Sequence, residues 1–178
     1  LRADSAHAIR AVCIVHNETS TGCTSRVEAV RRAIDAAGHP ALLLVDSISG
    51  LGSADLRVDD WGVDVAISGS QKGLMLPPGL SFNAISDKAL AAAHEATLPK
   101  SYWGWEEMLT ANARGYFPYT PATNLLYGLA EAIDMLEEEG LDEVFARHHR
   151  HAAATRAAVA AWGLETQCTV AEEHSPVL

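Results

Sequence analysis

The stretch Val63–Gly73, with the sequence VDVAISGSQKG, combines a strand pattern with an unusual loop. Its first half is apolar apart from Asp64, which is typical of a strand in a parallel sheet that is covered on both faces. Lys72 follows among small residues and is one of only three lysines, against ten arginines. A lysine that forms a Schiff base needs such a setting, because its amine must be positioned and partly desolvated. A solvated loop lysine is the alternative, and the rest of the chain decides between the two.

The composition excludes several classes of protein. The 178 residues, 48% of them hydrophobic, suffice for a domain with a core. A net charge of -10 argues against a nucleic-acid partner. No apolar stretch approaches the roughly 20 residues of a membrane span, and we expect no signal peptide, because the first residues contain no apolar core. The cysteines, at positions 13, 23 and 168, form no CxxC, so no metal site is expected. We expect a cytoplasmic protein with buried thiols.

The two ends of the sequence lie close to apparent structural elements. A strand pattern begins almost at once, and the sequence stops within another apparent segment. We therefore expect it to be an internal piece of a longer protein, inactive as an isolated polypeptide.

The pattern along the chain predicts an α/β domain with a mostly parallel sheet flanked by helices. Ser25-x-x-Glu28 resembles a capping box that opens a helix ending at Gly38. A long irregular segment rich in aromatic residues is expected at Thr97–Thr120, and loops of this length are usually functional or interfacial. The expected strands are Ile9–Val15, Ala41–Val45, Val63–Ile67 and Leu80–Ile85; the other expected helices are Asp87–Ala96, Pro121–Glu139 and Leu141–Trp162.

A change of organisation is expected near Gly140. Residues 1–140 are predicted to form part of a large domain. Residues 141–178 would hold a connecting helix and the start of a smaller C-terminal α+β domain, with a first strand at Leu164–Cys168.

Polar side chains follow the first three predicted strands. Thr19 comes shortly after the first strand, Asp46 ends the second, and Gln71 and Lys72 follow the third. Ligands of open α/β sheets bind beyond the carboxyl ends of the strands, so these residues are expected at one crevice. A lysine that holds an aldehyde as an imine, with an aspartate beside a pyridine nitrogen, is the pattern of pyridoxal 5′-phosphate sites. Taken singly, Thr19 and Asp46 would be turn residues.

Several motifs resemble the class V aminotransferases, which belong to the fold-type I pyridoxal-phosphate enzymes. The closest resemblance is to their serine–glyoxylate subgroup, and it extends over essentially the whole sequence. The motifs are Val15–Gly22 (VHNETSTG), Leu44–Ser49 (LVDSIS), Ser68–Gly73 (SGSQKG), Pro77–Gly79 (PPG), Tyr102-Trp103 and Tyr116–Asn124 (YFPYTPATN).

The resemblance implies a role for each matching residue. Lys72 would form the internal aldimine and move the proton between the substrate Cα and C4′. Asp46 would pair with the pyridine nitrogen, while Thr19 and Gln71 would hydrogen-bond the cofactor. Thr120 would reach the phosphate bound by a neighbouring subunit, which requires a homodimer or a higher even oligomer. Phe117 or Tyr119 stands where the family often has a second phosphate-binding tyrosine.

The resemblance also implies a reaction, the transfer of an amino group from L-serine, or from alanine, to glyoxylate. Asn17 and Thr19 could hydrogen-bond the hydroxymethyl group of serine, or could serve only the cofactor. In relatives the phosphate-binding turn lies upstream of Leu1 and the carboxylate-binding arginine downstream of Leu178.

Other functions on the same scaffold remain open. Alanine–glyoxylate and 2-aminoethylphosphonate transaminases are the main alternatives. A cysteine desulfurase would carry His where this sequence has Gln71. A non-catalytic scaffold of the same fold is disfavoured because Lys72 and Asp46 are both present.

Overall fold

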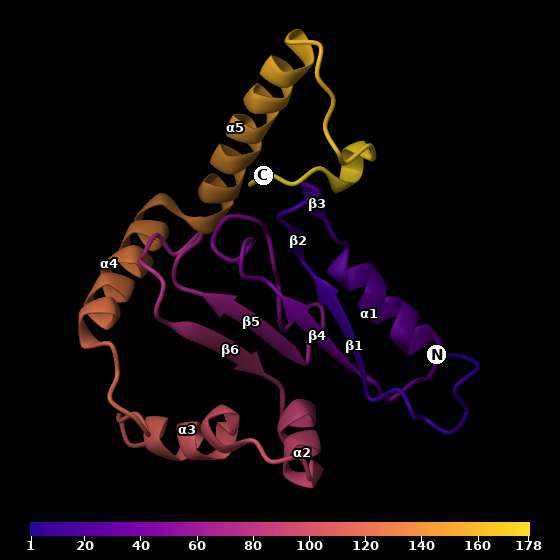
Figure 1. Ribbon diagram of the computed structural model, residues 1–178, viewed down its shortest axis with the longest axis vertical. Coiled ribbons are helices and arrows are strands. Elements are labelled where there is room, and N and C mark those ends of the chain that lie inside the picture. Colours follow the sequence, from indigo (N-terminus) through magenta and orange to yellow (C-terminus); the bar gives the residue numbers. More distant parts are fainter.

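The computed structural model describes residues 1–178 and is built on a four-stranded sheet (Figure 1). Its order is β1-β4-β5-β6, in which β1, β4 and β5 are parallel and β6 is antiparallel to β5. The predicted α/β architecture with a mostly parallel sheet is therefore confirmed. The strands are β1 (Ala11–Val15), β4 (Leu42–Asp46), β5 (Val65–Gly69) and β6 (Ser81–Ile85).

Helices and a short hairpin surround this sheet. None of the helices combines the length and the apolar character that crossing a bilayer requires. The hairpin of β2 (Asn17–Glu18) and β3 (Cys23–Thr24) follows β1 directly. The helices are α1 (Val27–Ala36), α2 (Asp87–Glu95), α3 (Trp105–Asn112), α4 (Thr123–Glu139) and α5 (Leu141–Ala161), with single turns of 3₁₀ helix at Ser101–Trp103 and Ala171–Glu173.

One face of the sheet carries the main core. Helix α1 packs Val27 and Ile34 against Leu43 and Val45 of β4, and all four are at most 1% exposed. The strands were expected to be covered on both faces, but in this chain the opposite face is partly open. On that face Ile67 is 38% exposed.

A second core joins the loop after β5 to the long helices. Leu74 and Leu76 pack against Leu136 of α4 and Val144 of α5. Because Lys72 lies two residues before Leu74, this core holds the C-terminal side of the lysine loop.

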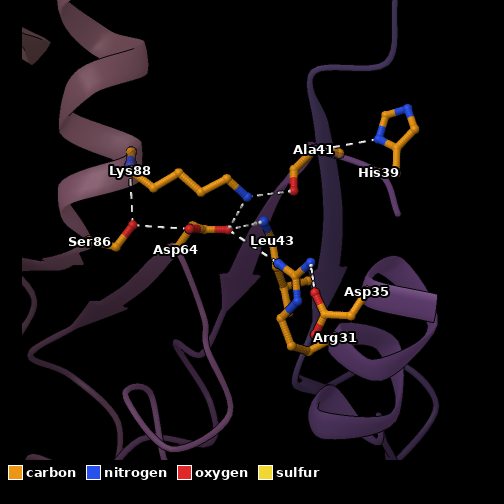
Figure 2. Close-up of polar contacts among 9 residues, drawn as sticks. Arg31, Asp35, His39, Ala41, Leu43, Asp64, Ser86 and Lys88 are labelled. Atoms are coloured by element: carbon orange, nitrogen blue, oxygen red, sulfur yellow. Dashed lines mark hydrogen bonds and ion pairs between the residues drawn. The ribbon is translucent and has the colours of Figure 1, made fainter. Parts of the chain in front are cut away.

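A buried carboxylate links four elements at the amino-terminal end of β5 (Figure 2). Asp64 accepts hydrogen bonds from the Leu43 amide at 2.8 Å and from the Ser86 hydroxyl at 3.0 Å. The Arg31 guanidinium and the Lys88 amine each lie 3.5 Å from the same carboxylate. The acidic residue within an otherwise apolar strand pattern thus joins α1, β4 and the start of α2 to β5.

The first helix begins differently from the prediction. Ser25 makes no capping bond; instead its backbone N–H donates to the His16 carbonyl at 2.7 Å. This bond holds Ser25 in extended chain beside the hairpin, so α1 begins at Val27 and Glu28 pairs with Arg32.

Two other local predictions are wrong. The segment Thr97–Thr120 contains the eight-residue helix α3, whose first turn carries Glu106 and Glu107 near the helix N-terminus. Leu164–Cys168 is not a strand, because no neighbouring strand pairs with it. The segment that follows returns to the hairpin, where His174 pairs with Cys23 and the Ser175 amide donates to Gly22. Figure 1 shows this return of the C-terminal end to β3. The division into two domains stays a prediction.

Candidate active site

Lys72 lies in a loop that is closed by one buried serine. Ser70 is fully buried; its hydroxyl donates to the Pro77 carbonyl at 2.8 Å and accepts from the Leu80 amide at 3.1 Å. Its backbone carbonyl also accepts from the Leu76 amide. The loop between β5 and β6 is therefore fixed at its base, while Lys72 itself is exposed at the rim.

The loop after β4 packs directly against the lysine loop. A Cβ atom on Gly73 would collide with the Leu51 carbonyl and would lie 2.6 Å from the Ser53 hydroxyl. Gly52, with a φ of +75°, faces the carbonyl of Gly73 from the other side. Two glycines thus allow the loops that follow adjacent strands to touch, and this contact sets the position of Lys72 relative to β4.

Asp46 ends β4 between the neighbouring strands. It pairs in register with Val15 of β1 and Ile67 of β5. One carboxylate oxygen, Oδ1, accepts from the Ile48 amide at 3.0 Å, and Oδ2 makes no hydrogen bond to protein. The next residue, Ser47, donates through both its amide and its hydroxyl to the Ile67 carbonyl, at 2.8 and 2.9 Å. Asp46 therefore presents a free oxygen from a firmly held strand end.

Thr19 lies at the exposed turn of the β2–β3 hairpin. The turn is shaped by Glu18, whose carboxylate accepts from the Ser20 amide at 2.9 Å and the Ser20 hydroxyl at 2.7 Å. The backbone hydrogen bond from Ser20 is the main cause of the lowered pKa of Glu18. The hydroxyl of Thr19 makes no hydrogen bond within the protein and faces solvent.

Asn17 cannot serve as a substrate contact, contrary to one of the possibilities drawn from the sequence. It is 2% exposed, and its amide is used within the protein. Its Nδ2 donates to the Ser49 hydroxyl at 3.1 Å, and its Oδ1 accepts from Thr24 at 3.1 Å. Asn17 instead ties the hairpin to the loop after β4.

His16 lies beneath the same loop. It is 2% exposed, its Nδ1 has no hydrogen-bond partner, and a Cβ on Gly50 would come within 2.5 Å of that nitrogen. Burial lowers the pKa of His16, against a smaller opposing effect of the Asp55 backbone. The ring is therefore a neutral packing element under the β4 loop.

The two remaining predicted site residues, Gln71 and Thr120, lie in different parts of the structure. Gln71 folds back over the end of β5, so that a Cβ on Gly69 would lie 2.8 Å from its Oε1. Thr120 lies on the exposed segment between α3 and α4 and makes no hydrogen bond to the strand-end residues. The chain thus gathers Thr19, Asp46, Gln71 and Lys72 at one sheet edge, and Thr120 stays apart from them.

The lysines are not equivalent. The Lys88 amine donates to the Ala41 carbonyl at 3.1 Å and lies near Asp64, and the Lys100 amine donates to Ala93 at 3.1 Å. The Lys72 amine makes no hydrogen bond or ion pair. It is the one lysine whose nitrogen has no partner within the chain.

Lys72 also borders a cavity. This space of ≈ 340 Å³ lies between the two strand-end loops and α5, and Ser53, Arg147 and His148 contribute to its wall. Burial is the main cause of the lowered pKa of His148, followed by the Arg147 charge. A larger cavity of ≈ 860 Å³ between α2 and α3 contains none of the predicted site residues.

An open α/β sheet with a free lysine amine and a free carboxylate oxygen in the segments after adjacent parallel strands is an arrangement in which α/β proteins bind ligands. The family model for class-V aminotransferases matches residues 2–177. The chain belongs to the class-V aminotransferases.

Individual relatives agree with this assignment. A serine–glyoxylate aminotransferase of Methylorubrum extorquens is 57% identical in an alignment of 171 positions that covers 93% of this chain and 42% of that protein. An L-aspartate–glyoxylate aminotransferase of Paracoccus denitrificans is 53% identical over 97% of this chain and 43% of its own length. The chain thus spans about two-fifths of the curated relatives that it matches.

The fold is also shared with solved structures. Pyridoxamine–pyruvate aminotransferase from Mesorhizobium loti superimposes with a TM-score of 0.86 at 31% identity, over 96% of this chain and 44% of that one.

Proposed function

We propose that the protein transfers the amino group of L-serine to glyoxylate, giving hydroxypyruvate and glycine, with pyridoxal 5′-phosphate held on Lys72. The observation that carries this proposal is the lysine amine without a partner in the loop that follows β5, while the adjacent parallel strand β4 ends at Asp46. The other two lysine amines are engaged within the protein.

The residues at the sheet edge fit this cofactor. A free amine suits an aldehyde, the Oδ2 atom of Asp46 is free to accept from a pyridine N–H, and the hydroxyl of Thr19 is exposed at the hairpin turn. When bound, the protonated pyridine ring supplies an electron sink for a substrate carbanion. We assign Gln71 and Thr19 to hydrogen bonds that orient the cofactor.

Lys72 also has a part in the chemistry. Its Nζ is proposed to take the proton from the substrate Cα and to deliver it to C4′. The buried Ser70 and the contact between Gly73 and Leu51 fix the backbone from which this side chain reaches. A base that moves a proton between two nearby atoms must be held within hydrogen-bond reach of both, which explains a rigid loop with a flexible side chain.

A homodimer, or a higher even oligomer, is part of the proposal. Several aromatic side chains near the segment between α3 and α4 are solvent-exposed in the single chain, which favours an interface there. They include Tyr102 (57% exposed), Trp103 (80%), Tyr116 (72%) and Tyr127 (80%). In such an assembly Thr120 would reach the phosphate bound by the second subunit. Sedimentation at falling concentration tests this, and a monomer that keeps full activity would overturn it.

We further propose a cytoplasmic location, which suits three unpaired cysteines.

The choice of serine as the amino donor is based on the relatives. The names of two relatives with at least 53% identity pair glyoxylate with serine and with aspartate. Steady-state rates of the full-length enzyme should be measured with serine, alanine, aspartate and 2-aminoethylphosphonate, each against glyoxylate and pyruvate. Serine with glyoxylate is expected to be fastest. If another donor is faster, the serine assignment is wrong and the transaminase proposal stands.

Covalent labelling tests the role of Lys72 directly. Borohydride reduction of the cofactor-loaded protein, followed by peptide mapping, should place the pyridoxyl group on Lys72. Lys88 and Lys100 serve as internal controls because their amines are engaged. A label on either of them would overturn the assignment. The Lys72→Ala variant should lose turnover.

A further inference from the structure

Two cysteines that are far apart in the sequence meet at one junction, where both neighbour His174. Cys23 belongs to β3 and is half-buried; Cys168 follows α5 and is 5% exposed. Both are free thiols. Burial raises the pKa of the Cys168 thiol, and the neighbouring Cys23 thiol raises it further. Of the three cysteines only Cys168 meets the expectation of a buried thiol.

The backbone holds the two cysteines together. Cys23 forms a β-bridge with His174, and the His174 ring lies 2.9 Å from the Cys168 carbonyl oxygen. The adjacent Ser175 amide donates to the Gly22 carbonyl at 2.8 Å. A salt bridge of 3.0 Å between Arg26 and Glu173 closes the same junction on the surface. The proximity of the thiols therefore depends on several bonds and not on one side-chain rotamer.

A small cavity opens at this junction on the Cys168 side. A cavity of ≈ 210 Å³ is lined by Cys168 and His174 together with Thr21 and Gly22 of the hairpin. Cys23 is the more accessible thiol, so it is the one that an external reagent meets first. A reactive thiol beside a second, sheltered thiol is the arrangement in which a mixed disulfide is resolved within the protein.

We propose that Cys23 and Cys168 form an intramolecular disulfide on reaction with a small-molecule disulfide. The Cys23 thiolate attacks the reagent, forming a mixed disulfide and releasing one small thiol. The Cys168 thiolate then attacks the Cys23 sulfur, forming the protein disulfide and releasing the second small thiol. Two protein thiols are oxidised and one small disulfide is reduced to two thiols. The product ties the β2–β3 hairpin to the segment after α5.

The bond would act on the element that carries Thr19. Cys23 lies on the return strand of that hairpin, so a cross-link there restricts the turn. An effect on cofactor binding rests on the proposed function, whereas the formation of the disulfide does not. The two can be tested separately, because the disulfide is detected in protein without cofactor.

The experiment uses full-length protein incubated with oxidised glutathione, alkylated, digested without reductant and mapped by mass spectrometry. Wild-type protein should yield a peptide pair joined through Cys23 and Cys168, which reductant separates. Cys13→Ser is the matched control and should keep the pair, because Cys13 lies on β1 and is exposed. Cys23→Ser and Cys168→Ser should each lack it.

The rate at which the mixed disulfide converts to the Cys23–Cys168 disulfide provides a second measurement. Because the pKa of Cys168 lies above its usual value of 9.0, the second step should accelerate as pH rises from neutral, by about tenfold per pH unit. A wild-type protein whose Cys23 stops at the mixed disulfide, or pairs with Cys13, would overturn the proposal.

Discussion

Gly73 lies so close to the carbonyl oxygen of Leu51 that no side-chain carbon fits between them. The contact joins the loop after β4, which begins at Asp46, to the loop after β5, which carries Lys72. The distance between the proposed ring partner and the proposed imine lysine is therefore set by backbone packing between two loops.

Substitution of Gly73 tests this contact. In Gly73→Ala the added methyl must push the loops apart, and we expect the free energy of unfolding to fall by about 1–3 kcal/mol. The fraction of Lys72 labelled by cofactor and borohydride should fall as well. Gly104→Ala is the control, since its Cβ would meet the Ser101 carbonyl at 3.3 Å, a much smaller overlap, and should lose less stability. Unchanged stability and labelling in Gly73→Ala would contradict the packing argument.

Replacement of Asp46 separates cofactor binding from catalysis. Asp46→Asn should retain the cofactor, because the Oδ1 contact with Ile48 can persist. The transamination rate should fall by about a hundredfold, since an amide cannot supply the charge that keeps the ring nitrogen protonated. Absorbance of the bound cofactor and single-turnover rates measure the two effects. The exposed Asp59→Asn is the control, and near-normal rates in Asp46→Asn would refute the role.

The buried carboxylate of Asp64 predicts a large effect on stability. In Asp64→Ala the Leu43 amide and Ser86 lose their acceptor, and Arg31, whose side chain is 13% exposed, loses a buried partner. We expect the free energy of unfolding to fall by about 3 kcal/mol in chemical denaturation. Asp55→Ala breaks the exposed pair with Arg57 and should cost less than about 1 kcal/mol. Equal losses in the two variants would argue against the network of Figure 2 as a stabilising unit.

The buried His16 predicts a loss of stability on mild acidification. Its folded-state pKa lies below its usual value of 6.5, so the unfolded chain takes up the proton first as the pH falls. The free energy of unfolding should be insensitive to this group well above that pH. It should decrease below it, by up to about 1.4 kcal/mol per pH unit.

Denaturant titrations between neutral pH and pH 5 measure this slope. His16→Gln should flatten it, whatever the variant does to stability at neutral pH. His149→Gln on the exposed face of α5 is the control that keeps the wild-type slope. His148, whose pKa is also lowered, accounts for a residual slope. A slope unchanged in His16→Gln would contradict the assignment.

The sequence alone determined the order of the main elements and the residues that end the parallel strands. Apolar runs and helical periodicity depend on residues within a few positions of one another, so strands and helices can be recognised before the fold is known. The placement of Asp46 and Lys72 at one sheet edge followed, because parallel strands bring their carboxyl ends together. The motif resemblance added the family, which the comparisons confirmed.

Only the tertiary structure decided which polar groups are free. Asn17 and Thr19 are near neighbours in the sequence, and both have polar side chains. The side-chain amide of Asn17 is hydrogen-bonded to Ser49 and Thr24, whereas the hydroxyl of Thr19 faces solvent. The junction that brings Cys23 and Cys168 to His174, like the partners of Asp64, also depends on residues distant in the chain. No local pattern encodes such contacts, because they arise when packed elements bring separate segments together and satisfy their buried polar groups.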